Sequence, residues 1–361
     1  MAKDLKSLRD EIDDVNYKIF ELLNYRTQIV KAIGNLKDGA GDDYFDSVRE
    51  EEMMENILNI NRGPLTNELV REVFSSIFSS SLKYMGINRD KKLLISSQSN
   101  TEFFDIASMF GFPDDNIPAI VAGPCSIEKV EYLETIAQLL KKNGIGIIRG
   151  GAFKPRTSPY EFQGLRREGI KILSEIAKKY DLVTVTEVVD TRDVEMVAEY
   201  VDVMQVGARN MYNYELLKEI GRSGKPVLLK RGLSATIHEF MMAAEYIGLQ
   251  GNRKIILCER GIRTYETKTR NTLDISSIPI IKKETKLPIL VDISHSLGRK
   301  DIVGYIAKAA LAAGADGLMV EVHPSPELAL SDSKQQLNPQ EFEEMLRLID
   351  PVFDRNISLK V

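Results

Sequence analysis

One short stretch of the sequence, residues 147–159, gathers the residue types that bind anions. It reads IIRGGAFKPRTSP, so an apolar run is followed by two glycines, two prolines and several polar side chains. Glycines let a backbone approach a ligand, and prolines restrict the shape of a loop. Arginine and lysine donate hydrogen bonds to phosphate or carboxylate oxygens. The stretch predicts an anion-binding loop after a strand, although a solvated basic loop would have the same composition. Its candidate anion-binding residues are Arg149, Lys154, Arg156 and Thr157.

More charged side chains follow other apolar runs further along the chain. The cationic ones are Arg209, Lys230 and Arg260, and the acidic ones are Glu187, Glu259 and Asp292. If these cations converge with those of residues 147–159, a chain of net charge −5 gains one strongly basic site. Such a site suits a ligand with two phosphates. The alternative is a set of ion pairs, but the cations outnumber the acidic partners.

A second set of residues has the ligand types of a divalent metal centre. Its members are Cys125, His295, Glu321 and Asp332. Thiolate, imidazole and carboxylate together suit manganese, iron, cobalt or zinc. The spacing supports this only weakly, because there is no C-x-x-C motif and the four residues come from different positions in the predicted barrel. Taken singly, Cys125 could be a buried thiol and Asp332 a helix cap. His323, two residues after Glu321, ranks below it as a ligand.

Eight short apolar runs, separated by amphipathic helix-like stretches, must position these residues. The runs span residues 117–123, 144–150, 182–188, 201–207, 225–231, 254–260, 287–294 and 317–323. Near-continuous apolar strands that alternate with helices indicate a parallel sheet covered on both faces. Eight of them predict an α/β fold, a (β/α)8 TIM barrel, whose strand ends carry the site. A doubly wound sheet is the alternative, but no G-x-G-x-x-G follows the first run.

The first 88 residues have a different pattern and predict an all-α three-helix domain. Apolar residues in the first helix recur at alternating spacings of four and three, a coiled-coil period. The stripe comprises Leu8, Ile12, Val15, Ile19, Leu22, Ile29 and Ile33, with Arg26 interrupting it. Asp46 is a plausible N-cap of the second helix, which runs to about residue 60; the third spans about residues 66–85. Three helices cannot bury such a stripe alone, so we expect a dimer.

Composition and charge exclude several classes of protein. The chain has 361 residues, 43% of them hydrophobic, and no apolar run of the length that crosses a membrane. Its net charge argues against a general nucleic-acid binder, and its charged N-terminus lacks a signal-peptide core. Two cysteines cannot build a disulfide framework, so we expect a cytoplasmic protein. We expect residues 1–88 and 117–361 to be domains and residues 89–116 to be the linker.

Several motifs together resemble one family. They are AGPCS (122–126), IRGGAFKPRTSP (148–159), VGARN (206–210), KPVLLKRG (225–232), LCERGIRTYE (257–266), DISHSLGRKD (292–301) and EVHPSPELALSD (321–332). This set resembles 3-deoxy-D-arabino-heptulosonate-7-phosphate (DAHP) synthase of the smaller-subunit class, over residues 117–350. The related 3-deoxy-octulosonate 8-phosphate synthases share the barrel, but KPRTS and the N-terminal helices favour DAHP synthase. Residues 1–88 resemble the all-helical chorismate mutases.

The resemblance implies condensation of phosphoenolpyruvate with erythrose 4-phosphate, the entry step of the shikimate pathway to chorismate and the aromatic amino acids. The implied metal, Mn²⁺ ahead of Fe²⁺, Co²⁺ or Zn²⁺, is held by Cys125, His295, Glu321 and Asp332. Lys154 is the implied proton donor, and Glu187 or water at the metal assists hydration. The implied substrate-binding residues are Arg149, Lys154, Arg156, Thr157, Arg209, Lys230, Arg260 and Asp292.

For the helical domain, the resemblance implies a site for chorismate or prephenate that regulates the synthase. The matching positions are Arg9, Arg26, Lys37, Asp46, Arg49, Glu50, Ser81 and Met85. The family usually has glutamine or glutamate where this chain has Met85, which cannot donate a strong hydrogen bond. A fully bifunctional synthase and mutase is therefore the alternative to a regulatory domain. Arg166 is a second departure, at a position that is commonly glycine. The assembly is expected to be a homodimer or homotetramer.

Overall fold

The computed structural model describes residues 4–40, 47–84, 93–111, 118–155, 158 and 160–349. The chain forms two compact units, Met1–Lys91 and Lys92–Val361. Within these described ranges, no helix is both long enough and apolar enough to cross a membrane.

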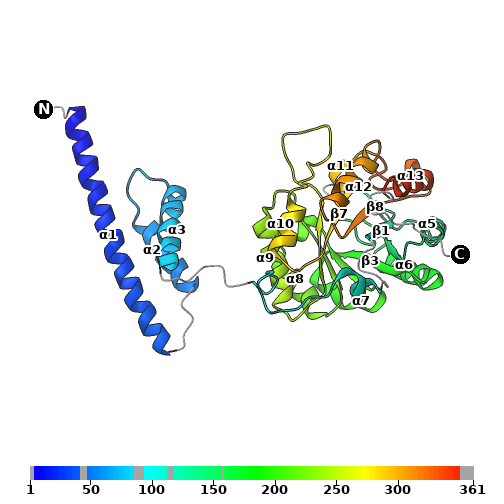
Figure 1. Ribbon diagram of the computed structural model, residues 1–361, viewed down its shortest axis with the longest axis horizontal. Helices are drawn as coiled ribbons and strands as arrows, with labels where there is room; N and C mark the ends of the chain where they lie inside the picture. The colour runs from blue at the N-terminus through cyan, green and yellow to red at the C-terminus, as the bar shows by residue number, and fades with distance from the viewer. Residues whose placement is uncertain are drawn as a thin grey trace. The chain divides into compact units, whose positions relative to one another are not determined.

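The N-terminal unit contains three helices, as the sequence predicts. They are α1 (Leu5–Ala40), α2 (Ser47–Ile60) and α3 (Asn67–Tyr84). Helix α3 packs against both α1 and α2 (Figure 1). The apolar stripe of α1 stays open to solvent in the single chain, since its members are between 44% and 66% exposed. A single copy therefore leaves this apolar stripe uncovered.

The second unit is a closed barrel of eight parallel strands in chain order, which confirms the predicted (β/α)8 fold. The strands are β1 (Ala119–Gly123), β2 (Ile147–Arg149), β3 (Val183–Val188), β4 (Val203–Val206), β5 (Val227–Lys230), β6 (Ile255–Glu259), β7 (Ile289–Asp292) and β8 (Gly317–Glu321). Every strand lies within the run that predicts it.

Helices surround the strands on the outside of the barrel (Figure 1). They are α5 (Val130–Lys142), α6 (Arg167–Tyr180), α7 (Val194–Tyr200), α8 (Tyr214–Arg222), α9 (Ile237–Gly248), α10 (Ser277–Glu284), α12 (Val303–Ala312) and α13 (Pro339–Ile349). Two five-residue helices, α4 (Ile106–Phe110) and α11 (Ile293–Leu297), and three 3₁₀ turns, Thr191–Asp193, Ala208–Asn210 and Pro326–Leu328, complete the described elements.

Side chains alternate between the two faces of each strand, and this alternation places the site. Early inward positions are apolar and belong to one cluster inside the barrel, for example Ile147, Leu228 and Leu290. Successive side chains of a strand point to opposite faces, so the next inward residue is two positions later. At that position the polar residues Arg149, Glu187, Gln205, Lys230, Asp292 and Glu321 occur. The barrel interior is therefore lined by apolar side chains at the strand starts and by charged or polar ones at the strand ends.

Helix α4 closes the apolar end of the barrel. Ile106 and Phe110 are 4% exposed and pack with the inward residues of the strands. The segment that precedes α4 in the chain is also attached to the barrel. The backbone amides of Leu94 and Ile95 donate to the buried carboxylate of Glu245 on α9, at 2.9 and 3.2 Å. Residues 93–111, which fall in the expected linker, thus contribute core side chains to the second unit.

Candidate active site and metal centre

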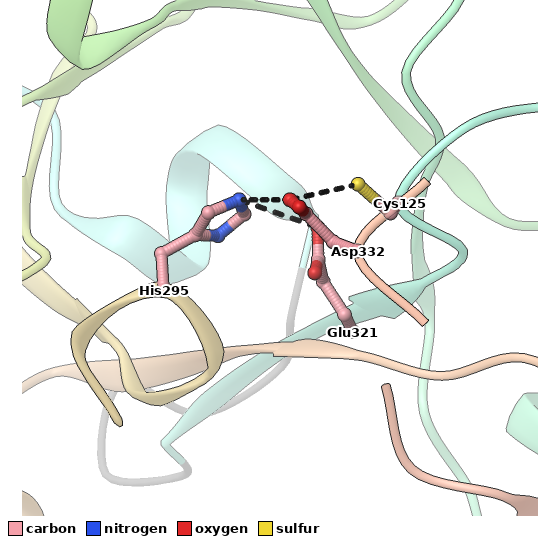
Figure 2. Close-up of side chains that lie close together, drawn as sticks. All are labelled: Cys125, His295, Glu321 and Asp332. Atoms are coloured by element: carbon pink, nitrogen blue, oxygen red, sulfur yellow. Dashed lines mark hydrogen bonds and ion pairs between the residues drawn. The ribbon is translucent and has the colours of Figure 1, made fainter. Parts of the chain in front are cut away.

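Four side chains from three parts of the barrel meet at its charged end. Cys125 follows β1, His295 lies on α11 after β7, and Glu321 and Asp332 come from β8 and its loop. One ligand atom from each lies within 4.8 Å of all the others. Figure 2 shows these four side chains pointing toward one another. His295 Nε2 lies 3.5 Å from Glu321 Oε1 and 3.6 Å from Asp332 Oδ2.

Asp292 fixes the orientation of the His295 ring. Its Oδ1 accepts the backbone N–H of His295 at 2.9 Å, which also caps α11, and its Oδ2 lies 2.8 Å from His295 Nδ1. Burial lowers the pKa of His295, although Asp292 opposes this shift. A neutral ring with its proton on Nδ1 leaves the Nε2 lone pair facing Glu321 and Asp332. A carboxylate behind a histidine is the usual support for a metal-binding imidazole.

The charges of this group fit a bound cation. Burial opposes ionisation of Glu321 and Asp332, yet His295 and Arg149 lower the pKa of Glu321, while Arg270 and His295 lower that of Asp332 to about 2. Burial, together with Glu321, raises the pKa of the Cys125 thiol to about 12. If Cys125 also ionises, its thiolate and the two carboxylates repel one another, and a divalent metal would neutralise these charges. The donor set suits a metal of borderline softness.

A cavity of about 180 Å³ opens beside these ligands. His295 and Asp332 line it together with predicted binding residues from five other strands or loops. The predicted residues among its walls are Arg149, Lys154, Glu187, Arg209, Lys230 and Arg260. The structure thus brings together the cations that the sequence places after separate strands. Positive charge focused in one cavity favours a multiply anionic ligand.

Two of these cations are held by buried ion pairs inside the barrel. Arg149 Nη1 lies 3.1 Å from Glu321 Oε1 and donates to the carbonyl of Pro124 at 2.7 Å. Its Nε is buried and has no hydrogen-bond partner among the described residues. Lys230 pairs with Asp292. Burial alone would raise the pKa of Asp292, but His295 and Lys230 hold it well below its usual range. These contacts keep both cations fixed before any ligand binds.

Lys154 lines the basic cavity and contacts Cys125, one of the four candidate metal ligands. Its Nζ donates to the Cys125 carbonyl and lies near Cys125 Sγ, both at 3.1 Å. Burial alone would lower the pKa of Lys154, but Cys125 and Glu321 raise it. A Cβ on Gly151 would come within 2.5 Å of the Cys125 carbonyl oxygen and 2.8 Å of Lys154 Cδ. Glycine is therefore required there for the lysine to reach this place.

Glu187 is positioned by residues of the neighbouring strand. Gln205 Nε2 donates to Glu187 Oε2 at 3.3 Å. A Cβ on Gly207 would lie 2.0 Å from Glu187 Oε1, so only glycine admits the carboxylate. Gln205 and Gly207 also line the cavity, and sequence reasoning did not single out Gln205. Its signal was available, because it occupies the same inward position on β4 as Glu187 does on β3.

Three further cavity residues come from the loop after β6. Arg263, Arg270 and Asn271 line the cavity, and Arg270 Nη1 lies 3.2 Å from Asp332 Oδ2. Asn271 donates to the His295 carbonyl at 2.8 Å. Sequence reasoning missed all three. A loop carries no periodicity from which the direction of a side chain could be inferred.

Other predicted residues lie apart from this group or outside the described residues. His323 is buried, but its Nδ1 accepts the Ser325 amide and its Nε2 faces Glu128 at 3.8 Å, so it does not join the four ligands. Burial raises the pKa of Cys258 to about 12. Arg156 and Thr157 lie outside the described residues.

In the N-terminal unit, two predicted site residues meet. Arg26 on α1 donates to the hydroxyl of Ser81 on α3, and its guanidinium lies 5.0 Å from the centre of the Phe78 ring. Arg9 and Arg49 are exposed, and Arg49 lies 3.1 Å from Glu52. Asp46 and Met85, and the side chains of Lys37 and Glu50, lie outside the described residues.

Comparisons with known proteins agree with this geometry. The family model described as the DAHP synthetase I family matches residues 105–355, and the model of chorismate mutase type II matches residues 8–86. A phospho-2-dehydro-3-deoxyheptonate aldolase from Thermotoga maritima is 55% identical over 235 residues, which cover 65% of this chain and 70% of that protein. A 2-dehydro-3-deoxyphosphooctonate aldolase from Acidithiobacillus ferrooxidans is 29% identical over 251 residues, covering 64% and 88%.

Solved structures give the same result. The crystal structure of the Thermotoga maritima phospho-2-dehydro-3-deoxyheptonate aldolase (DAHP synthase) aligns with a TM-score of 0.68 and 50% identity, over 73% of this chain and 77% of that one. A truncated form of 3-deoxy-D-arabino-heptulosonate 7-phosphate synthase from the same organism aligns with a TM-score of 0.66 and 49% identity, over 72% and 96%.

Proposed function

Because this chain belongs to the DAHP synthetase I family and carries a chorismate mutase type II domain at residues 8–86, we propose that it condenses phosphoenolpyruvate with erythrose 4-phosphate in a metal-dependent reaction that its helical domain regulates. The products are DAHP and inorganic phosphate. The observation that carries this proposal is the group of Cys125, His295, Glu321 and Asp332 at the edge of a strongly cationic cavity.

Those four residues would hold a divalent metal, with Mn²⁺ as our first choice. A metal bound there supplies Lewis-acid polarisation of the aldehyde carbonyl. Asp292 orients His295 and Arg270 contacts Asp332, so these two residues would hold the ligands in place. Both cysteines are unpaired and buried. A thiol ligand requires a reducing compartment, and we place the enzyme in the cytoplasm.

The protein's own cations bind phosphoenolpyruvate in this proposal. Arg149 and Lys230 are fixed by buried acidic partners, while Arg209 and Arg260 complete the wall of the cavity. Their charge stabilises the phosphate group as it leaves C2 of the pyruvyl unit. Donors that are already positioned need little reorganisation when the charge develops.

Lys154 donates the proton that the new alkoxide takes up. Its raised pKa keeps it protonated, and it lies next to the metal ligands. Glu187, held by Gln205, is placed to accept a proton from the water that attacks C2. Arg156 and Thr157 are proposed to bind the aldose phosphate.

Phosphate release from defined substrate pairs tests this function. We expect rapid release with phosphoenolpyruvate plus erythrose 4-phosphate, and almost none with phosphoenolpyruvate alone. Arabinose 5-phosphate is the matched alternative aldose, because 2-dehydro-3-deoxyphosphooctonate aldolases share part of this sequence. Turnover with arabinose 5-phosphate that equals or exceeds turnover with erythrose 4-phosphate would contradict the proposed substrate.

We also propose that the helical domain binds the dianion chorismate or prephenate and thereby inhibits the synthase. Arg26, held by Ser81 and Phe78, supplies a partly buried cation for a ligand carboxylate. The exposed stripe of α1 supports self-association through this domain, and we propose a homodimer or a larger homo-oligomer. Saturating prephenate should lower synthase turnover in the wild type and have no effect on Arg26→Ala. Unchanged wild-type turnover would contradict the regulatory role.

A second activity, conversion of chorismate to prephenate, is favoured by the chorismate mutase match at residues 8–86. Met85 is its critical position, because methionine cannot donate a strong hydrogen bond to the breaking ether. A direct mutase assay on wild type and Met85→Gln separates the two cases. If the wild type already matches Met85→Gln, the domain is catalytic as well as regulatory.

A further inference from the structure

Two adjacent glutamines contact the proposed metal ligands and have no role in the mechanism described above. Gln335 and Gln336 are 5% and 0% exposed, and both follow Asp332 in the loop after β8. This segment runs beside the end of β8 through a parallel bridge between Val322 and Leu337. Gln335 ends a turn whose backbone N–H donates to the Asp332 carbonyl at 3.3 Å, and the two glutamines reach different parts of the site.

Gln335 reaches the carboxylate ligands. Its Nε2 donates to Glu321 Oε2 at 2.6 Å and lies 3.5 Å from Asp332 Oδ2. Its Oε1 accepts from Arg270 Nη1 at 2.7 Å, and the same nitrogen lies 3.2 Å from Asp332 Oδ2. Gln335, Arg270 and Asp332 thus form a closed ring, and Glu321 is attached to it through Gln335. This ring occupies Glu321 Oε2 and leaves Glu321 Oε1 on the side of His295.

Gln336 reaches the thiol ligand from the other side. Its Oε1 accepts the backbone N–H of Cys125 at 2.9 Å, and its Nε2 donates to the carbonyl of Ser331 at 2.8 Å. Ser331 also shares a 2.6 Å hydrogen bond with Ser126. The buried side-chain amide of Gln336 therefore links Cys125 to Ser331, the residue before Asp332.

The backbone at Asp332 needs such support. Its φ is 48°, in the left-handed region that non-glycine residues rarely adopt. Strained conformations of this kind persist where surrounding contacts determine them. The contacts here are the Gln336 bond to the preceding carbonyl and the Arg270 contact to the carboxylate.

We propose that Gln335 and Gln336 are positioning residues of the metal centre with separate duties. Gln335 orients the carboxylates of Glu321 and Asp332, and Gln336 places the Cys125 thiol. Both act through the ligands and neither touches the metal. This inference rests on the proposed metal centre and adds to it two residues that determine how tightly the site binds.

Cobalt binding to the full-length protein tests this division of duties. Metal is removed with a chelator, and Co²⁺ is then titrated into wild type, Gln335→Leu, Gln336→Leu and Gln340→Leu. Gln340 is an exposed glutamine on α13 and serves as the matched control. The near-ultraviolet sulfur-to-cobalt charge-transfer band reports the thiol, while the titration midpoint reports affinity.

We expect Gln335→Leu and Gln336→Leu to bind Co²⁺ about 10–100-fold more weakly, because losing a hydrogen-bond partner of a metal ligand usually lowers metal affinity by this factor. Gln336→Leu should also weaken or shift the charge-transfer band, whereas Gln335→Leu should keep it. Gln340→Leu should match the wild type. Far-ultraviolet circular dichroism and Tm check folding, and Gln335→Asn and Gln336→Asn, which withdraw the amide by one methylene, replace any variant that fails to fold.

Two results would overturn the inference. One is wild-type affinity and spectrum in both buried variants. The other is the same spectral change in both, which would indicate a general loss of packing instead of separate duties. A wild type that binds no Co²⁺, or binds it without a charge-transfer band, would contradict the proposed metal centre itself.

Discussion

His295 and Asp292 are joined twice, once through the backbone amide of His295 at 2.9 Å and once through its ring Nδ1 at 2.8 Å. The carboxylate thereby caps α11 and selects the ring tautomer with one side chain. The other ring nitrogen is left facing Glu321 and Asp332 at 3.5 and 3.6 Å. The last residue of β7 thus sets the orientation of the His295 ring.

Replacing Asp292 with asparagine should therefore weaken metal binding. An amide can meet the ring through its N–H₂ group and favour the wrong tautomer, and Lys230 loses its ionic partner. We expect Co²⁺ affinity to fall about 10–100-fold. Titration of the metal-free protein measures this. Asp301→Asn is the control, because Asp301 forms its ion pair with exposed Arg299. Equal affinity in Asp292→Asn and wild type would contradict this role.

Metal binding should release about one proton at neutral pH. Burial raises the pKa of Cys125 to about 12, so the metal-free thiol is protonated at pH 7, while the metal-bound form is the thiolate. The lowered pKa of His295 means that this ring is already neutral and has no proton to release. Affinity should therefore rise about tenfold per pH unit between about pH 6 and 8.

Isothermal titration of Co²⁺ in buffers with different ionisation enthalpies counts the protons. Cys125→Ser is the control, because a serine hydroxyl does not ionise in this range. Wild-type binding without proton release would show that the thiol is not a ligand.

Removing the proton donor should reduce turnover more than substrate binding. For Lys154→Met we expect kcat to fall about 10²–10⁴-fold. Lys154→Arg keeps the positive charge in the cavity but does not readily release a proton, so it should restore KM for phosphoenolpyruvate while kcat stays low. Steady-state kinetics of both variants measure this split. Recovery of kcat in Lys154→Arg would assign Lys154 to charge stabilisation alone.

Arg166 should carry a cost in stability. Its φ of 50° and ψ of −128° lie in a region that glycine reaches without strain, and its side chain is exposed. Arg166→Gly should raise the free energy of unfolding by about 1 kcal/mol. Arg166→Ala removes the charge but keeps the strained backbone, so it should bring no gain. Urea unfolding measures both variants, and equal gains from glycine and alanine would attribute the effect to charge.

The sequence predicts the barrel and its strand-borne residues well because strand periodicity is simple. On several strands an apolar inward residue, such as Leu228 or Leu290, is followed two positions later by a charged one, Lys230 or Asp292. A parallel barrel brings those positions to one mouth. The same rule would have identified Gln205.

The loop residues follow no such rule. Gln335 and Gln336 reach the site because of a bridge between Val322 and Leu337 and a left-handed turn at Asp332. Neither feature has a periodic signature. Helix α4 was missed for a similar reason, since five residues are too few to display the spacing of a buried face.

Turnover of chelator-treated protein is the most direct test of a metal-dependent condensation. Phosphate release from phosphoenolpyruvate and erythrose 4-phosphate should disappear when metal is removed and return when Mn²⁺ is added. Cys125→Ser should regain little activity at the same Mn²⁺ concentration. Full phosphate release by wild-type protein that elemental analysis shows to be free of metal would contradict the account.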